Sequence, residues 1–254
     1  MSESMMIRRL AWATVAFSMI GVGAACNSDS SDSSTTSQPS VTTSSTTNAT
    51  APLTGFLETQ DGAKGSVTYK AELPQLKGGD AVVRDAFNGA MRTALDDYLK
   101  PNEDNLSVTV APGVLNEDDR SEVAHIGTGA VAGVLLLNIF VDHAAHPFNV
   151  VATTVIDAHT AKPIMITDLF TDPTAGLTAL VDGIKSEIAA DEKLAGQPAP
   201  EPVADQLANW VPDDDGLVVY LPVAHVLGDY YPVTVDWDAL SGVLAPGMRE
   251  KLTT

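Results

Sequence analysis

One segment of this 254-residue chain cannot take part in a folded core, and it separates the residues before it from those after it. Residues 27–50 read NSDSSDSSTTSQPSVTTSSTTNAT, and 16 of these 24 residues are Ser or Thr. The segment has almost no apolar side chains to bury, so it cannot offset the entropy lost when a chain becomes ordered. We therefore predict a flexible stalk with an r.m.s. span of about 27 Å. The region of Cys26 and the stalk is expected over residues 26–52, and the folded domain over residues 53–254.

The residues before the stalk have the architecture of a signal peptide. Arg8 and Arg9 form a basic start, and residues 10–22 (LAWATVAFSMIGV) are apolar apart from one Thr and one Ser. Small residues then lead to Cys26. This order of a basic region, a short apolar region and small residues is typical of secretory signals. The apolar region is also shorter than the ~20 residues that a transmembrane helix needs. We predict removal of residues 1–25.

Cys26 is the only cysteine in the chain, so no disulfide can form within it. Its position after Gly23-Ala24-Ala25 resembles the lipobox of bacterial lipoproteins, although Gly23 stands where that motif usually has Leu. The resemblance implies that Cys26 is diacylated and becomes the new amino terminus, anchored in the extracytoplasmic face of the cell membrane. Ordinary secretory cleavage after Ala25, with an idle thiol, is the alternative.

The charge balance limits the class of partner. The chain has 33 acidic and 14 basic residues, and removal of residues 1–25 leaves 32 and 12, a net charge of −20. Phosphate backbones repel so acidic a chain, so we expect no nucleic-acid partner. A cationic protein would be attracted.

The folded part shows strand patterns and two helical patterns in an irregular order. In the first helix, Val83, Phe87 and Leu95 recur at helical spacing, with Asp80 as a candidate N-cap and Pro101 as a stop. The helices are expected at 78–100 and 171–194, and the strands at 65–76, 106–112, 121–142 (two strands), 149–160, 216–222 and 231–237. Because strands and helices do not alternate regularly, we predict an α+β fold of mostly antiparallel sheets packed with two main helices.

One stretch carries a resemblance to a known family. Residues 145–170 read AHPFNVVATTVIDAHTAKPIMITDLF. They resemble the extracytoplasmic domain of RsiV-type anti-sigma factors, a domain type shared with secreted mycobacterial immunogenic antigens. The matching positions are His146-Pro147, Asp157, Thr160, Lys162 and Asp168-Leu169-Phe170, with Ala161 in place of the family's Gly. The segments 214–222 and 231–240 extend the resemblance.

The resemblance implies an α+β domain over about residues 53–245 and a place in the cell envelope. RsiV-type relatives recognise lysozyme, a strongly basic protein, which an acidic domain suits electrostatically. The matching residues themselves have structural explanations. Asp157 can bond turn amides, Asp168 can cap the turn before the second helix, and Phe170 can anchor that turn in the core.

A search for reactive constellations assigns no catalytic residue. No Ser lies in a Gly-x-Ser-x-Gly motif, and acidic residues are too abundant to single out a glycosidase pair. Asp142, His143 and His146 lie in a stretch that leaves a strand and ends in Pro147, where the i and i+3 imidazoles would not share a face. We therefore expect no metal site and no other cofactor.

Five residues remain as candidate contacts for a ligand or partner. Asp213, Asp214 and Asp215 form an acidic turn before a strand, and Tyr230 and Tyr231 follow a Gly-Asp loop. The other late aromatic residues are expected in the core. The first functional hypothesis is a surface-displayed binding module for a cationic protein or a wall ligand. The second is an envelope enzyme or accessory factor acting on cell-wall glycan or lipid. The sequence leaves the oligomeric state open.

Overall fold

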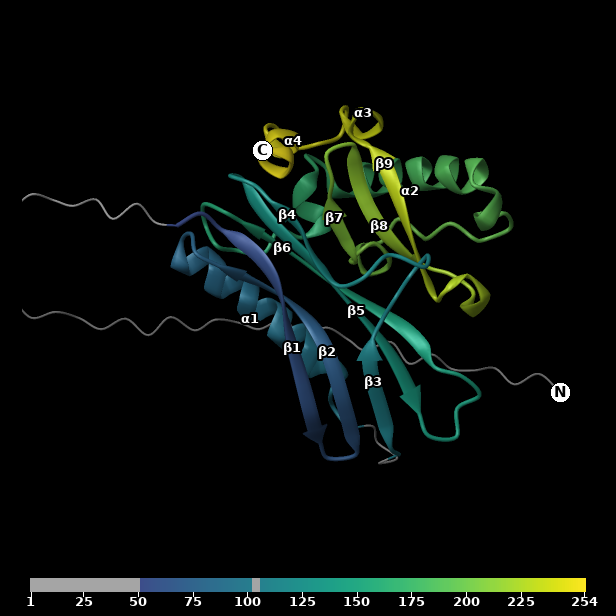
Figure 1. Ribbon diagram of the computed structural model, residues 1–254. Helices are drawn as coiled ribbons and strands as arrows, with labels where there is room; N and C mark the ends of the chain where they lie inside the picture. The colour runs from purple at the N-terminus through teal and green to yellow at the C-terminus, as the bar shows by residue number, and fades with distance from the viewer. Residues whose placement is uncertain (1–50, 102–105) are drawn as a thin grey trace, which may run out of the picture. The chain divides into compact units, whose positions relative to one another are not determined.

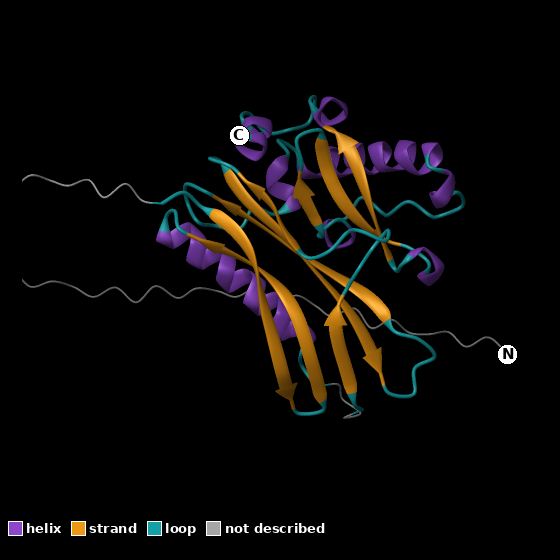
Figure 2. Cartoon of the chain, viewed as in Figure 1, coloured by secondary structure: helices purple, strands orange, loops and turns teal. Residues whose placement is uncertain are grey.

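The computed structural model describes residues 51–101 and 106–254, so the predicted signal peptide, Cys26 and most of the stalk lie outside the described residues. The described part is an α+β fold with two sheets and two main helices, as predicted (Figure 2). The strands are β1 (Thr54–Lys64), β2 (Val67–Lys77), β3 (Val108–Pro112), β4 (Glu122–Ile126), β5 (Ala130–Val141), β6 (Phe148–Asp157), β7 (Trp210–Pro212), β8 (Gly216–Pro222) and β9 (Tyr230–Asp236). The α-helices are α1 (Ala81–Tyr98), α2 (Pro173–Ala190), α3 (Trp237–Leu240) and α4 (Met248–Thr253), and the 3-10 turns are η1 (Ile166–Leu169), η2 (Glu192–Leu194), η3 (Ala204–Gln206) and η4 (His225–Leu227).

The larger sheet is organised around β5. β6 pairs antiparallel with β5 along one edge, from Ala130↔Asp157 to Ile139↔Phe148. The other edge of β5 is shared, because β4 pairs with it at Val131–Val134 and β3 pairs with it at Leu137–Val141. The hairpin β1–β2 joins through β3, and β2–β3 is the one parallel pairing among the described strands.

β5 is buried on both faces. Ala130, Ala132, Val134 and Leu136 belong to one apolar cluster, while the alternate residues Val131, Leu135, Leu137 and Ile139 belong to another. Alternation places successive side chains on opposite faces of a strand, so β5 is covered on both sides. Its apolar run VLLLNIF lies in this central strand, as predicted from the sequence, and is buried from Val134 to Leu137, while Phe140 near its end is exposed.

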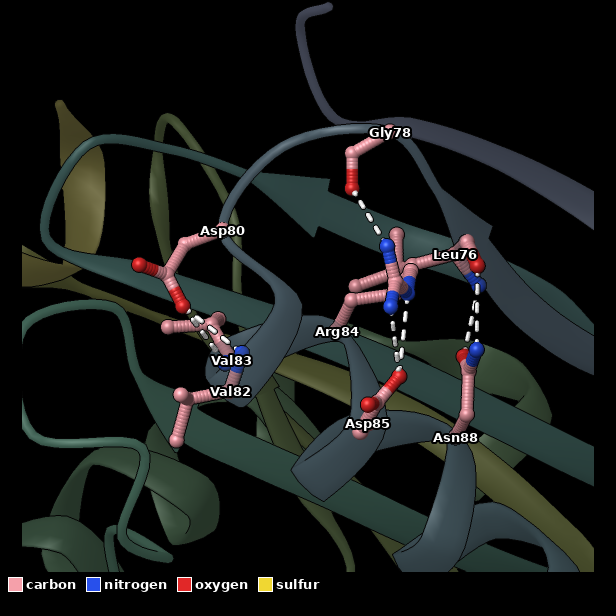
Figure 3. Close-up of polar contacts among 8 residues, drawn as sticks. All are labelled: Leu76, Gly78, Asp80, Val82, Val83, Arg84, Asp85 and Asn88. Atoms are coloured by element: carbon pink, nitrogen blue, oxygen red, sulfur yellow. Dashed lines mark hydrogen bonds and ion pairs between the residues drawn. The ribbon is translucent and has the colours of Figure 1, made fainter. Parts of the chain in front are cut away.

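Helix α1 covers one of these faces. Val83, Phe87, Met91 and Leu95 are buried against β2, β5 and β6, and Asp80 caps the helix by accepting from the amides of Val82 and Val83 (Figure 3). Asn88 is also buried: its Oδ1 accepts from Leu76 N at 2.7 Å and its Nδ2 donates to Leu76 O at 2.9 Å. β2 pairs with β3 only at Val67–Tyr69, and farther along β2 the side chain of Asn88 forms hydrogen bonds with the backbone N–H and C=O of Leu76.

The smaller sheet, β7–β8–β9, covers the other face of β5, and α2 packs against this sheet on its far side (Figure 1). Asp172 is the N-cap of α2 and accepts from the amides of Thr174 and Ala175. None of the helices in the described ranges is long and apolar enough to cross a membrane.

The motif at 157–170 has the structural roles predicted for it. Asp157 Oδ1 accepts from the amides of His159 and Thr160, each at 2.8 Å, and so stabilises the turn after β6. Asp168 Oδ2 accepts from Met165 N at 2.9 Å at the start of η1. Phe170 is 5% exposed and lies in the core beside α2.

Two strands were not predicted from the sequence. β1 has few apolar residues, and β7 is only three residues long, too short to show a pattern in the sequence. The residues of β1 are mostly exposed, because β1 lies at an edge of the sheet.

Candidate functional site

The acidic turn predicted as a contact region connects β7 to β8. Asp213 N donates to Gly216 O at 2.9 Å, and Asp213 Oδ1 accepts from Asp214 N at 2.8 Å. The indole Nε1 of the buried Trp237 donates to Asp213 O at 2.9 Å. These bonds hold the turn against the core and leave the side chains of Asp213, Asp214 and Asp215 exposed.

The turn forms one wall of a hollow of about 550 Å³. Carboxylates from four segments line it, and we call this surface the acidic hollow: Glu187, Asp213, Asp214, Asp215, Asp236 and Asp238. Arg249 of α4 is the one basic residue of its lining, and its Nη1 lies 2.8 Å from Asp238 Oδ1. Six carboxylates around one guanidinium leave a surplus of negative charge facing solvent.

Negative charge continues from the acidic hollow toward β4. The pKa of Glu122 is raised by burial, and Asp119 and Asp213 add to the effect by repulsion. The pKa of His125 is lowered by burial, although Asp214 and Asp213 oppose that change. Asp213 and Asp214 therefore act electrostatically on neighbours in a different sheet.

Tyr230 and Tyr231 lie at the opposite end of β9 from Asp236, about 20 Å away at 3.3–3.4 Å per residue. The hydroxyl of Tyr231 donates to Asp191 Oδ2 at 2.7 Å, and this bond lowers the pKa of Asp191. Burial raises the pKa of Tyr230, and Asp229 adds to that rise. The structure therefore brings the three aspartates together but does not bring the two tyrosines to them.

The other late aromatic residues are in the core, as predicted. Trp210, Tyr220 and Trp237 are 2%, 8% and 1% exposed. None of these three presents a face for stacking on a ligand.

Three residues of the acidic hollow were not singled out from the sequence: Glu187, Asp236 and Asp238. The acidic residues on both sides of Trp237 are a local signal for the second and third. Glu187 comes from α2, and only the fold brings it near the β7–β8 turn. Within residues 51–101 and 106–254, no group of three or more His, Cys, Asp or Glu side chains is placed to hold a metal ion.

The fold and this surface define an α+β domain with two packed sheets and an acidic face. No protein-family model and no curated protein matches the chain. Among solved structures, it is similar to a member of the DUF3298 family from Bacteroides fragilis NCTC 9343, with a TM-score of 0.52 and 15% identity over 81% of this chain and 98% of the other. It is also similar to a DUF3298 family protein from Pseudomonas aeruginosa PAO1, with a TM-score of 0.50 and 14% identity over 78% of this chain and 97% of the other. At these identities the similarity shows a shared fold.

Proposed function

We propose that the chain is an envelope lipoprotein that displays an RsiV-like domain as a binding module for a cationic protein, with the acidic hollow as its contact surface. The observation that carries the proposal is the gathering of six exposed carboxylates around one arginine. Three of them come from the predicted turn, and the others come from α2, the end of β9 and α3.

Electrostatic complementarity supports this partner class. Opposite charge on two proteins raises the rate of encounter and disfavours partners of like charge. The predicted mature chain has a net charge of −20, so its long-range field attracts a basic protein. The acidic hollow adds a local concentration of negative charge on an open surface, where a protein can reach it.

The membrane anchor is the part of the proposal that rests on Cys26. Labelling with a clickable fatty acid should mark the parent chain and not a Cys26→Ala variant. Equal labelling of both chains, or labelling of neither, would contradict lipidation at this residue.

Binding is tested with a lysozyme as the basic probe at low and moderate salt. The informative variant is Asp214→Asn with Asp215→Asn, because Asp213 also holds the turn through its bond to Asp214 N. We expect measurable binding at low salt, weaker binding at higher salt, and a further loss of about fivefold in the double variant, since exposed charge pairs contribute up to ~1 kcal/mol.

A matched control removes the same charge elsewhere. Asp61→Asn with Asp205→Asn neutralises two exposed carboxylates outside the acidic hollow. This variant should bind within about twofold of the parent, because screening weakens distant charges. Absence of binding at low salt, or equal losses in the two double variants, would rule out the acidic hollow as a contact surface for this class of partner.

A further inference from the structure

Two imidazoles that are far apart in the sequence stack on each other at the opposite end of β9 from the acidic hollow. His146 lies in the β5–β6 loop and His225 begins η4. Their ring centroids are 3.8 Å apart and their planes are inclined by 12°. Both residues are exposed. The sequence indicates no shared face for His143 and His146, and the fold places His146 against His225 instead.

Each ring donates through the same nitrogen. His225 Nδ1 lies 2.9 Å from Asp229 Oδ1, and His146 Nδ1 lies 3.0 Å from Pro147 O. A carboxylate and a carbonyl oxygen only accept, so each Nδ1 carries the hydrogen. In the neutral form, Nε2 of both rings therefore carries the lone pair. Histidines that bind metals show this arrangement, with the non-ligating N–H bonded to a carboxylate or a carbonyl.

Asp229 is itself held firmly, which fixes the orientation of His225. Its Oδ2 accepts from Asn149 N at 2.7 Å, and its side chain is 16% exposed. Asn149 Nδ2 in turn donates to Gly228 O at 3.1 Å and Val114 O at 3.3 Å. The hydrogen bonds that support His225 therefore extend from the η4–β9 turn to Asn149 of β6 and to Val114, which follows β3.

The ring centroids are 3.8 Å apart, so a rotation of one ring can bring both Nε2 atoms to the same ion. Bonds from imidazole nitrogen to transition metals are about 2.0–2.1 Å long. In a parallel stack the two lone pairs point along nearly parallel planes, so His146 must rotate relative to His225, which Asp229 holds in place, for both to face the same ion. Exposed side chains on loops make such rotations on the nanosecond scale.

We propose that His146 and His225 form a two-imidazole binding site for a divalent transition-metal ion, with Asp229 as a positioning residue. Imidazole nitrogen suits Cu²⁺, Ni²⁺ and Zn²⁺, whereas Mg²⁺ and Ca²⁺ prefer oxygen ligands. Water completes the coordination of the ion. The carboxylate of Asp229 fixes the tautomer and the orientation of the His225 ring, and its negative charge favours a bound cation.

The test uses the full chain carrying Cys26→Ala, so that its single thiol does not compete for the metal. Titration calorimetry with each metal chloride should give one saturable site, with Cu²⁺ bound more tightly than Ni²⁺ or Zn²⁺ and no heat of binding for Mg²⁺. His146→Ala and His225→Ala should each lose this site. His159→Ala, which removes another exposed imidazole, should retain it.

Two further measurements test the role of Asp229. Nitrogen NMR shifts of the metal-free chain should show both His146 and His225 protonated at Nδ1. Asp229→Asn keeps the shape of the side chain and tolerates the positive φ of 73° at this position, and it should weaken Zn²⁺ binding about tenfold. The proposal is overturned if the parent shows no saturable binding, if either histidine variant binds as tightly as the parent, or if either ring is protonated at Nε2. Unchanged affinity in Asp229→Asn would remove the positioning role.

Discussion

Asp157 shows how one buried carboxylate can join distant parts of the chain. Besides the two turn amides, its Oδ2 accepts from Lys251 Nζ at 2.6 Å, and Lys251 belongs to α4. Burial alone would raise the pKa of Asp157, but the bonds from Lys251, Thr160 and His159 outweigh burial and hold the pKa well below its ordinary value of 3.8. The ionised form is therefore the one that the fold stabilises.

Replacing Asp157 should make stability less sensitive to acid. In the parent, the stabilisation that comes from ionised Asp157 is complete above about pH 4 and is lost as the pH falls through the depressed pKa. Asp157→Asn should lower the free energy of unfolding by about 2 kcal/mol at pH 7, since bonds to a charged group contribute about 1.5–3 kcal/mol. Denaturant unfolding at pH 7 and at pH 3 measures the difference, which should shrink at the lower pH. A difference that stays constant between the two would contradict the role of the charge.

Ala161 lies in the turn that Asp157 stabilises, with a φ of 55°. This left-handed conformation costs a residue with a Cβ about 1–2 kcal/mol, whereas Gly adopts it freely. Ala161→Gly should therefore raise the free energy of unfolding by about 1 kcal/mol. The greater entropy of Gly in the unfolded chain opposes this gain and reduces it. Ala158→Gly in the same turn serves as the control and should not stabilise, because Ala158 does not have a positive φ. A lower free energy of unfolding in Ala161→Gly would contradict the prediction that the positive φ of Ala161 costs stability.

Hydrogen bonds between residues close together in the sequence could be predicted, whereas those between distant residues could not. The caps at Asp80 and Asp168 were predicted because their bonds reach amides two or three residues away. The bond between Asp157 and Lys251 spans 94 residues, so no sequence pattern indicates it. The same holds for His146 and His225, which become neighbours only when β5–β6 and β8–β9 are placed together.

At the scale of elements, Asn88 joins α1 to β2 by two hydrogen bonds to Leu76 (Figure 3). Asn88→Ala leaves a buried N–H and a buried C=O without this partner. We expect a loss of about 2–3 kcal/mol in the free energy of unfolding, measured by denaturant titration. Asn88→Asp should be at least as destabilising, because a carboxylate cannot donate to Leu76 O and is costly to bury.

The neighbouring Gly89 provides a control on the same helical turn. A Cβ added at Gly89 meets no atom within 4 Å, so Gly89→Ala should leave packing unchanged. It should stabilise the chain by about 0.5–1 kcal/mol through helix propensity. If Gly89→Ala were as damaging as Asn88→Ala, the loss at Asn88 would reflect a general intolerance of this turn.

The predicted and unpredicted strands differ in burial. β5 and β8 have long apolar runs because they are buried, and both were predicted within a few residues. β1 pairs with β2 along its whole length, yet its residues are mostly exposed and polar. An edge strand needs fewer apolar residues than a central one, so its sequence carries a weaker signal. The class of fold was predictable because the central elements determine it.

At the scale of the whole molecule, the acidic residues could be counted from the sequence, but their gathering could not be predicted. The β7–β8 turn was a candidate because three aspartates are adjacent there. Glu187 joins it only because α2 packs on β9, and Glu122 lies near Asp213 only because β4 contacts β7. The acidic hollow is therefore a product of the packing of α2 on the smaller sheet, and the packing of the two sheets extends its negative charge to Glu122.

Such a gathering of like charges should lower the free energy of unfolding at neutral pH, and a substitution at Glu122 can measure this cost. The pKa of Glu122 is raised from its ordinary value of 4.5 by burial and by repulsion from Asp119 and Asp213. Below about pH 4 both the folded and the unfolded chain hold this proton, so there is no penalty. As the pH rises through the raised pKa, the folded chain must ionise Glu122 beside other carboxylates, and stability falls.

Glu122→Gln should therefore raise Tm at pH 7 and leave it unchanged below about pH 4. The side chain keeps contact with solvent, which screens the repulsion, so we expect a rise of about 1–2 °C. Calorimetry at both pH values and at two salt concentrations measures it, and the gain at pH 7 should shrink with added salt. Glu72→Gln provides a matched change on β2, outside the lining of the acidic hollow, and should not raise Tm at pH 7. If Glu122→Gln also raised Tm at low pH, the amide would simply pack better than the acid. Repulsion from Asp119 and Asp213 would then not explain the rise in Tm.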